Sequence, residues 1–129
     1  MPIILVVDDN PQMVKLLQDM VQLAGYETEV AFSGLEGLDK ARHGMPDLIL
    51  VDLMMPDMDG WQLYHRLREF TTIPVIFVTA YDTPNNEAKA IALGAEGFIG
   101  KDLTPVQLVQ HIQFVLKADN RSSGQEIYH

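Results

Sequence analysis

Three short aliphatic runs constrain the fold of this chain more than any other feature of its sequence. They are IILVV at residues 3–7, LILV at residues 48–51 and VIFV at residues 75–78. Continuous apolar runs of this kind are typical of parallel strands covered on both faces, whereas strands with one face in water alternate apolar and polar residues. The runs therefore predict the centre of a parallel sheet with helices on both faces.

Two more strands and five helices are predicted around these runs. The additional strands are expected at residues 27–32 and 97–99. The intervening segments carry apolar residues three and four positions apart, which is the period of a helix with one buried side. These segments are residues 11–24, 34–42, 60–70, 84–93 and 104–118. Strand and helix alternate throughout, so the predicted fold class is α/β.

Length and composition predict one soluble domain. The chain has 129 residues, 47% of them hydrophobic and 21% charged, as in ordinary globular proteins. We assign residues 1–118 to the domain and the polar, aperiodic residues 119–129 to a tail or linker stub. No apolar run approaches the roughly 20 residues that span a bilayer, and no signal peptide is recognisable, so we expect a cytoplasmic protein without a membrane partner.

Charge and cysteine content exclude several classes of function. The chain has no cysteine, which rules out disulfides, zinc–thiolate sites and thiol nucleophiles. Its net charge of -9 argues against nucleic-acid binding by this chain, because lysine and arginine must neutralise the phosphates.

Polar residues follow four of the predicted strands. Asp8 and Asp9 follow the first, Asp52 the third, Thr79 the fourth and Lys101 the fifth. Ligands of an open parallel sheet bind at the carboxyl ends of its strands. We therefore expect three carboxylates, a hydroxyl and an ammonium to meet at one edge of the sheet.

Each of these residues also has an ordinary structural explanation. Asp8 or Asp9 could cap the following helix, and Lys101 could be a solvated loop residue. Thr79 could be a β-branched strand end without a function. Asp52 is harder to explain in this way, because burying a carboxylate without partners is costly. Their joint occurrence favours a functional site.

Three clustered carboxylates would need a cation. Two like charges 4 Å apart repel by roughly 4 kcal/mol at an effective dielectric constant of 20. Oxygen ligands with room for water favour Mg²⁺. A divalent ion beside a hydroxyl and an ammonium suits a phosphoryl group, and a carboxylate in line with it can act as the nucleophile.

Four motifs in the chain resemble the receiver domain of two-component response regulators. They are VVDD at residues 6–9, LILVDLMMPDMDG at 48–60, VIFVTA at 75–80 and GFIGK at 97–101. The resemblance extends over residues 3–118. It implies a doubly wound, flavodoxin-like (βα)5 fold with a five-stranded parallel sheet of order 2-1-3-4-5 and helices on both faces.

The resemblance also implies roles for the residues at the acidic edge. Asp52 would be the phosphoacceptor. Mg²⁺ would be bound by Asp9, Asp52 and the backbone carbonyl of Met54, and Asp8 would support it through water.

Three further residues would respond to phosphorylation. Thr79 and Lys101 would contact the phosphoryl oxygens, and Phe98 would be the aromatic residue that changes rotamer with the movement of Thr79.

The implied function is a signalling switch rather than an enzyme that turns over a substrate. A histidine kinase or a histidine phosphotransfer protein would donate the phosphoryl group, and a downstream protein or fused output domain would respond. The change would reach the surface formed by residues 84–93, 97–99 and 104–118. That surface is also a possible homodimer contact, where Phe114 is either exposed or part of the core.

The chain departs from the receiver pattern at Asp102, where receivers usually carry proline. We expect a trans peptide bond there, with Asp102 either capping the last helix or competing for the charge of Lys101. The bulky residues Met54 and Tyr81 flank the acceptor and offer no base for water, so we hypothesise slow dephosphorylation.

The loop after the acceptor contains two more acids. We predict that Asp57 is solvated and that Asp59 caps the next helix. In the helix predicted at residues 34–42, Leu35, Leu38 and Ala41 form the predicted buried stripe.

Three other functions remain as alternatives. A phosphohydrolase of the haloacid-dehalogenase type would carry a second aspartate two residues after the nucleophile, where this chain has Met54. A flavin- or nucleotide-binding domain would need a glycine-rich phosphate loop, which is not found. A degenerate receiver would bind partners without phosphorylation, although here the acceptor, metal, hydroxyl and lysine positions are all filled.

Overall fold

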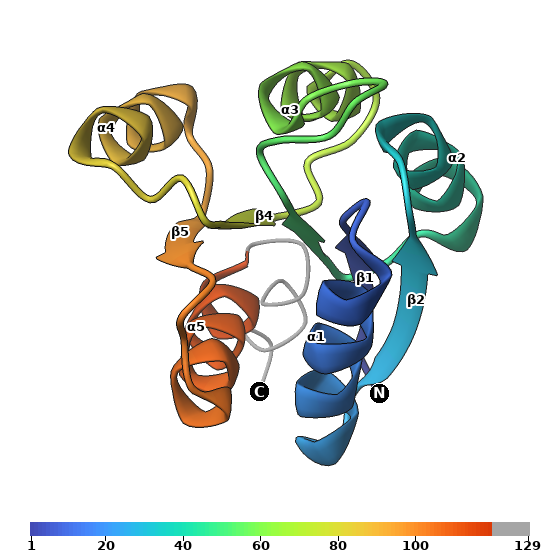
Figure 1. Ribbon diagram of the computed structural model, residues 1–129. Coiled ribbons are helices and arrows are strands. Elements are labelled where there is room, and N and C mark those ends of the chain that lie inside the picture. Colours follow the sequence, from blue (N-terminus) through green and yellow to red (C-terminus); the bar gives the residue numbers. More distant parts are fainter. Residues whose placement is uncertain (120–129) are drawn as a thin grey trace.

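The computed structural model describes residues 1–119, which form strands and helices in strict alternation (Figure 1). The strands are β1 (Ile3–Val7), β2 (Glu27–Ala31), β3 (Leu48–Val51), β4 (Val75–Thr79) and β5 (Gly97–Gly100). The helices are α1 (Pro11–Leu23), α2 (Gly34–Gly44), α3 (Gly60–Arg68), α4 (Pro84–Leu93) and α5 (Pro105–Ala118). All ten predicted elements are present, and their ends differ from the prediction by at most two residues.

The five strands form one parallel sheet in the order β2-β1-β3-β4-β5. Helices α1 and α5 cover one face, and α2, α3 and α4 cover the other (Figure 1). The predicted doubly wound α/β fold with helices on both faces is therefore confirmed.

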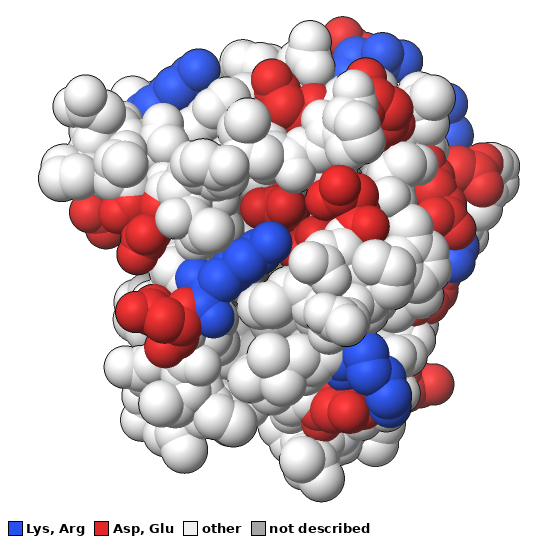
Figure 2. Space-filling model, in the orientation of Figure 1, with Lys and Arg blue, Asp and Glu red and all other residues white. Residues whose placement is uncertain are grey.

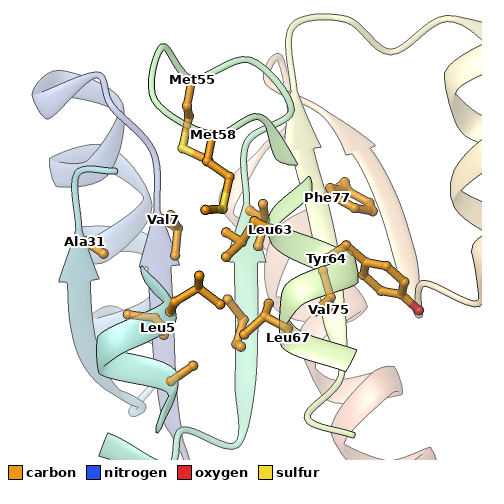
Figure 3. Packing of buried hydrophobic residues seen from close by; sticks show 14 of the residues in the cluster. Leu5, Val7, Ala31, Met55, Met58, Leu63, Tyr64, Leu67, Val75 and Phe77 are labelled. Atoms are coloured by element: carbon orange, nitrogen blue, oxygen red, sulfur yellow. The ribbon is translucent and has the colours of Figure 1, made fainter. Parts of the chain in front are cut away.

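The apolar strand runs supply two cores at once. Successive residues of a strand point to opposite faces. In β1, Leu5 and Val7 join the core under α2 and α3, part of which Figure 3 shows, while Ile4 and Val6 join the core under α1 and α5. Each fully buried aliphatic side chain contributes about 1.5–3 kcal/mol, so the centre of the sheet is the most strongly stabilised part of the fold.

Two helices are capped by residues other than the aspartates considered as caps in the sequence analysis. Asn10, rather than Asp8 or Asp9, caps α1 by accepting bonds from the N–H groups of its first turn. Thr104, rather than Asp102, caps α5, and it forms a reciprocal capping box with Gln107. At both helices the cap is the residue directly before the first helical residue, because only its side chain reaches the free N–H groups.

The predicted cap of α3 is confirmed. The Asp59 side chain accepts a hydrogen bond from the N–H of Gln62, whose own side chain bonds back to the Asp59 N–H. The expected trans peptide before Asp102 is also confirmed, since residues 1–119 contain no cis bond.

In the stripe predicted for α2, Leu38 and Ala41 are buried as expected, but the prediction for Leu35 is wrong. Leu35 is 61% exposed, because α2 packs through its glycines: a Cβ on Gly37 would lie 3.1 Å from the Val7 side chain.

Asp57 is exposed to solvent, as predicted, but its carboxylate also contacts α2. Its carboxylate accepts hydrogen bonds from the N–H groups of Gly34, at 3.3 Å, and Leu35, at 3.2 Å, and so occupies the positive end of the α2 dipole.

Most of the predicted tail, residues 120–129, lies outside the described residues. Within residues 1–119, none of the helices has the length and apolar character needed to cross a membrane.

Candidate functional site

The ends of the central strands bring the predicted site residues to one edge of the sheet. The ladder pairs Val7 with Val51, so the residues that follow them, Asp8 and Asp52, are neighbours. The N–H of Asp52 donates to the Val7 carbonyl at 3.0 Å, and the N–H of Lys101 donates to the Thr79 carbonyl at 3.0 Å. Backbone pairing therefore brings these residues to the same edge of the sheet.

Three carboxylates form the acidic part of the site. One oxygen each from Asp8, Asp9 and Asp52 lies within 4.8 Å of the others, a separation that a single cation can bridge. Asp8 and Asp52 are buried, at 1% and 5% exposure, while Asp9 is exposed. Acidic atoms gather near the centre of the face shown in Figure 2, with a basic side chain beside them.

The buried carboxylate of Asp8 is only partly satisfied. Its Oδ1 accepts a hydrogen bond from the N–H of Asn10 at 2.9 Å. Its Oδ2 accepts no aligned hydrogen bond from the described residues, although Lys101 Nζ lies 2.9 Å away. A buried oxygen of this kind, among oxygen donors only, fits a hard cation such as Mg²⁺.

Lys101 provides the positive charge of the site. Its ammonium lies 2.9 Å from Asp8 Oδ2 and 3.3 Å from Asp52 Oδ2. Burial lowers the pKa of Lys101, but its contact with Asp8 and the charges of both carboxylates outweigh that effect and raise the pKa above its ordinary value. The ordinary explanation, that Lys101 is a solvated loop residue, therefore does not apply.

The surroundings of Asp52 disfavour its charged form. Burial, followed by the negative charge of Asp8, raises the pKa of Asp52 above its ordinary value. Lys101 and the N–H of Met54 act in the opposite direction without cancelling this rise. Any cation bound here would favour the carboxylate form.

Thr79 and Phe98 lie on the β4–β5 side of the site. The Thr79 side chain is fully buried, and its Oγ1 accepts a hydrogen bond from the N–H of Tyr81 at 3.0 Å. Phe98 is half-buried, and its ring centroid lies 6.4 Å from that of Phe77. No hydrogen bond joins the Thr79 hydroxyl to Lys101 within residues 1–119.

Two residues that shape the site were not predicted from the sequence to have a functional role. Asn10 both caps α1 and donates its N–H to Asp8. Gly60 follows the acceptor loop, and a Cβ there would lie 2.5 Å from the carbonyl oxygen of Asp52 and 2.9 Å from Leu53 Cα. The sequence features that could have indicated these roles are the Asp-Asn pair before Pro11 and the glycine at the first position of α3.

The fold and the site define an open α/β protein with an acidic, cation-compatible centre at the carboxyl ends of its strands. Residues 4–113 match the family model of the response regulator receiver domain. The chain belongs to this family, whose members are phosphorylation-dependent switches of two-component signalling rather than classical enzymes.

Several known proteins are similar over most of this chain. The polar-differentiation response regulator DivK of Brucella abortus is 36% identical over 116 residues, which cover 88% of this chain and 94% of DivK. The uncharacterized transcriptional regulatory protein YclJ of Bacillus subtilis is 32% identical over 88% of this chain. The chain spans about half the length of YclJ, 50% of it.

Solved structures have the same fold. The Vibrio cholerae chemotaxis protein CheY4 superposes with a TM-score of 0.83 at 31% identity, over 89% of this chain and 98% of CheY4. A Francisella response regulator receiver domain superposes with a TM-score of 0.85 at 29% identity, over 91% of this chain and 98% of that one.

Proposed function

We propose that Asp52 accepts a phosphoryl group from a histidine kinase or a histidine phosphotransfer protein, in a reaction that requires Mg²⁺. The observation that carries this proposal is the position of the Asp52 carboxylate, which is 5% exposed and lies beside Asp8, Asp9 and Lys101 at the end of β3. A carboxylate so close to a cation site is suited to attack phosphorus rather than only to support the loop.

The transfer exchanges one bond to phosphorus for another. An Asp52 Oδ atom forms a bond to phosphorus while the bond from phosphorus to the donor's histidine nitrogen breaks. The electron pair of that bond stays on the nitrogen. With a proton on the other ring nitrogen of the donor, the histidine leaves as a neutral imidazole and the aspartyl phosphate remains. Lys101, 3.3 Å from Asp52 Oδ2, is close enough to attract an incoming phosphoryl oxygen.

Four residues are proposed as the metal site. Asp9, Asp52 and the backbone carbonyl of Met54 would bind Mg²⁺ directly, and Asp8 would support it through water. Mg²⁺ bound here would neutralise the clustered carboxylates and draw charge from the phosphoryl group. The buried, incompletely satisfied Asp8 Oδ2 supports this assignment.

Thr79 and Phe98 are proposed to carry the response. Thr79 would exchange its bond with the Tyr81 N–H for one with a phosphoryl oxygen, and Phe98 would move into the space that opens. Their places on adjacent, paired strands support a shared movement.

The surface of α4, β5 and α5 is proposed as the partner contact. A groove between these elements is lined by polar and apolar side chains, and two of the apolar ones, Ile91 and Phe114, are 68% and 74% exposed. A downstream protein, a fused output domain or a second copy of the chain would bind here. Phe114 was expected to be either exposed or part of the core, and it is exposed.

The proposed organisation is a receiver domain over residues 1–118 and a tail or linker stub over residues 119–129. We place the protein in the cytoplasm, without nucleic-acid or membrane contacts of this chain, on the basis of its family and its net charge of -9.

Dephosphorylation is proposed to be slow. The side chains of Met54 and Tyr81 are 54% and 53% exposed beside the acceptor, where neither offers a base to activate water. Loss of the phosphoryl group should become faster in Tyr81→Ala, and fast loss that this substitution leaves unchanged would contradict the proposal.

Intact mass after incubation with acetyl phosphate tests the proposed function. Wild type should gain one phosphoryl group when Mg²⁺ is present and none when it is chelated. Asp52→Asn should gain none, whereas Asp39→Asn, an exposed acid on α2, should behave as wild type. No gain in wild type would indicate a degenerate receiver, and turnover of a phosphate ester would indicate a hydrolase.

A further inference from the structure

A row of aromatic rings connects α3 with β5. The ring centroids of Trp61 and Phe77 are 5.0 Å apart, and those of Phe77 and Phe98 are 6.4 Å apart. Phe77 is fully buried and lies two residues before Thr79, so both side chains point to the same face of the sheet. The row therefore ends beside the two residues proposed to move on phosphorylation.

Lys89 on α4 covers the outer end of this row. Its ammonium lies 4.6 Å from the centroid of the Trp61 ring, which is within the range of a cation–π interaction. Among the described residues Lys89 has no ion pair with a carboxylate that would compete for its charge. The charge of Lys89 is thus directed at the indole ring.

A second side chain joins α4 to the same rings. The Tyr64 hydroxyl donates a hydrogen bond to the carbonyl of Leu93, the last residue of α4, at 2.9 Å. The Tyr64 ring centroid lies 5.9 Å from that of Phe77, and Figure 3 shows the two rings next to each other. The contacts of Lys89 with Trp61 and of Leu93 with Tyr64 therefore both involve rings that pack against Phe77.

Apolar burial does little to hold α4 in place. Ala90 is its one buried residue, whereas α5 buries Leu108, Ile112 and Val115 and α1 buries four residues. With so little apolar surface covered, the position of α4 depends unusually strongly on the contacts of Lys89 and Tyr64.

We propose that Lys89 is a positioning residue for the phosphorylation switch. Its ammonium over Trp61 holds α4 in the resting arrangement and, through Phe77, biases Phe98 and Thr79 towards their resting positions. This inference rests on the proposed function and adds a residue that sets how readily the switch operates.

The size of the effect follows from the strength of the contact. A contact made in only one of two arrangements shifts their equilibrium by its own free energy. A surface cation–π interaction corresponds to about a two- to fivefold change in an equilibrium constant. Removing the charge of Lys89 should therefore favour the phosphorylated arrangement by about that factor.

The test uses the full chain and three variants. Lys89→Gln removes the charge, Lys89→Arg keeps a cation that can lie over the indole, and Lys15→Gln removes a charge from an exposed lysine on α1. Two quantities are measured: the fluorescence of Trp61, the single tryptophan of the chain, without phosphodonor, and the fraction of protein phosphorylated at subsaturating acetyl phosphate with Mg²⁺.

Lys89→Gln should change the Trp61 emission and raise the ratio of phosphorylated to unphosphorylated protein by about two- to fivefold. Lys89→Arg and Lys15→Gln should match wild type in both measurements. The inference is overturned if Lys89→Gln matches wild type, if Lys89→Arg behaves like Lys89→Gln, or if emission changes while phosphorylation does not. If wild type gains no phosphoryl group, the proposed function fails, and this inference fails with it.

Discussion

The central strands β1 and β3 bury far more of their residues than β5 and α4 at the edge of the sheet. All the residues of β3 are buried, as are those of β1 after its first residue, and side chains from both helical layers cover these strands. At the other edge no residue of β5 is fully buried, and α4 buries only Ala90. The strands that lead to Asp8 and Asp52 are thus held by apolar packing on both faces. In contrast, α4 and β5 bury little apolar surface, and polar and aromatic contacts contribute more to their position. A switch needs such a difference, since its site must keep its geometry while another part moves.

The largest expected effect is on stability, when a buried side chain of a central strand is shortened. Leu50→Ala in β3 should lower the free energy of unfolding by about 3 kcal/mol, because Leu50 is 1% exposed and its removal leaves a cavity. Ile91→Ala on α4 should cost less than about 0.5 kcal/mol, since Ile91 is 68% exposed. Urea unfolding of both variants measures the difference, and equal losses would contradict the comparison.

A smaller effect on stability should arise from the charges of Asp8 and Asp52 at the ends of the central strands. Without Mg²⁺ at pH 7, Asp52→Asn should raise the free energy of unfolding by about 1 kcal/mol, because it removes a buried charge that Asp8 repels. Thermal unfolding with and without Mg²⁺ measures this, and added Mg²⁺ should stabilise wild type more than the variant.

The matched control for that measurement is Glu27→Gln. It removes the same charge from an exposed position at the amino end of β2, away from the site, and should leave the stability nearly unchanged. Destabilisation by Asp52→Asn would show that Lys101 compensates the acidic pair more fully than the raised pKa of Asp52 indicates.

The smallest effect concerns the loop that joins β3 to α3. Asp57→Asn should lower the free energy of unfolding at pH 7 by about 0.5 kcal/mol, because the carboxylate binds the positive end of α2. Although slight burial acts to raise it, bonds from the backbone of Leu35 and Gly34 set the pKa of Asp57 below its ordinary value of 3.8.

The sign of the pH dependence follows from that lowered pKa. A carboxyl group whose pKa falls on folding stabilises the protein above its unfolded pKa, and this contribution is lost as the pH falls through the folded pKa. The difference in stability between wild type and Asp57→Asn should therefore be full at pH 7 and disappear as the pH falls through the lowered pKa of Asp57. Unfolding at a series of pH values measures it, and a gap that widens towards acid would be inconsistent with the Asp57 contacts.

Sequence patterns predicted some parts of the site better than others. The aspartates, the threonine and the lysine were predicted to converge because parallel strands end at one edge, and Asp8, Asp52, Thr79 and Lys101 do converge there. The cap of α5 was missed, because Asp102 and Thr104 are both good capping residues and only the first helical residue decides between them.

The wrong prediction for Leu35 has a different cause. Nothing local to Leu35 shows that Gly34 and Gly37 let α2 lie close to Met58 and Val7, which turns Leu35 outward. The distant Asp57 then finds the free N–H groups of that helix, a contact between residues more than twenty positions apart.

The sequence by itself determined the alternation of strands and helices, the two-faced sheet and the residue types at its acidic edge. These follow from local apolar periodicity and from the geometry of parallel strands, which every chain with this pattern shares. Only the tertiary structure decided that Asp8 Oδ2 is buried and incompletely satisfied, and that Lys89 lies over Trp61. Burial and contacts between distant side chains depend on how closely the helices approach the sheet, and no local pattern contains that distance.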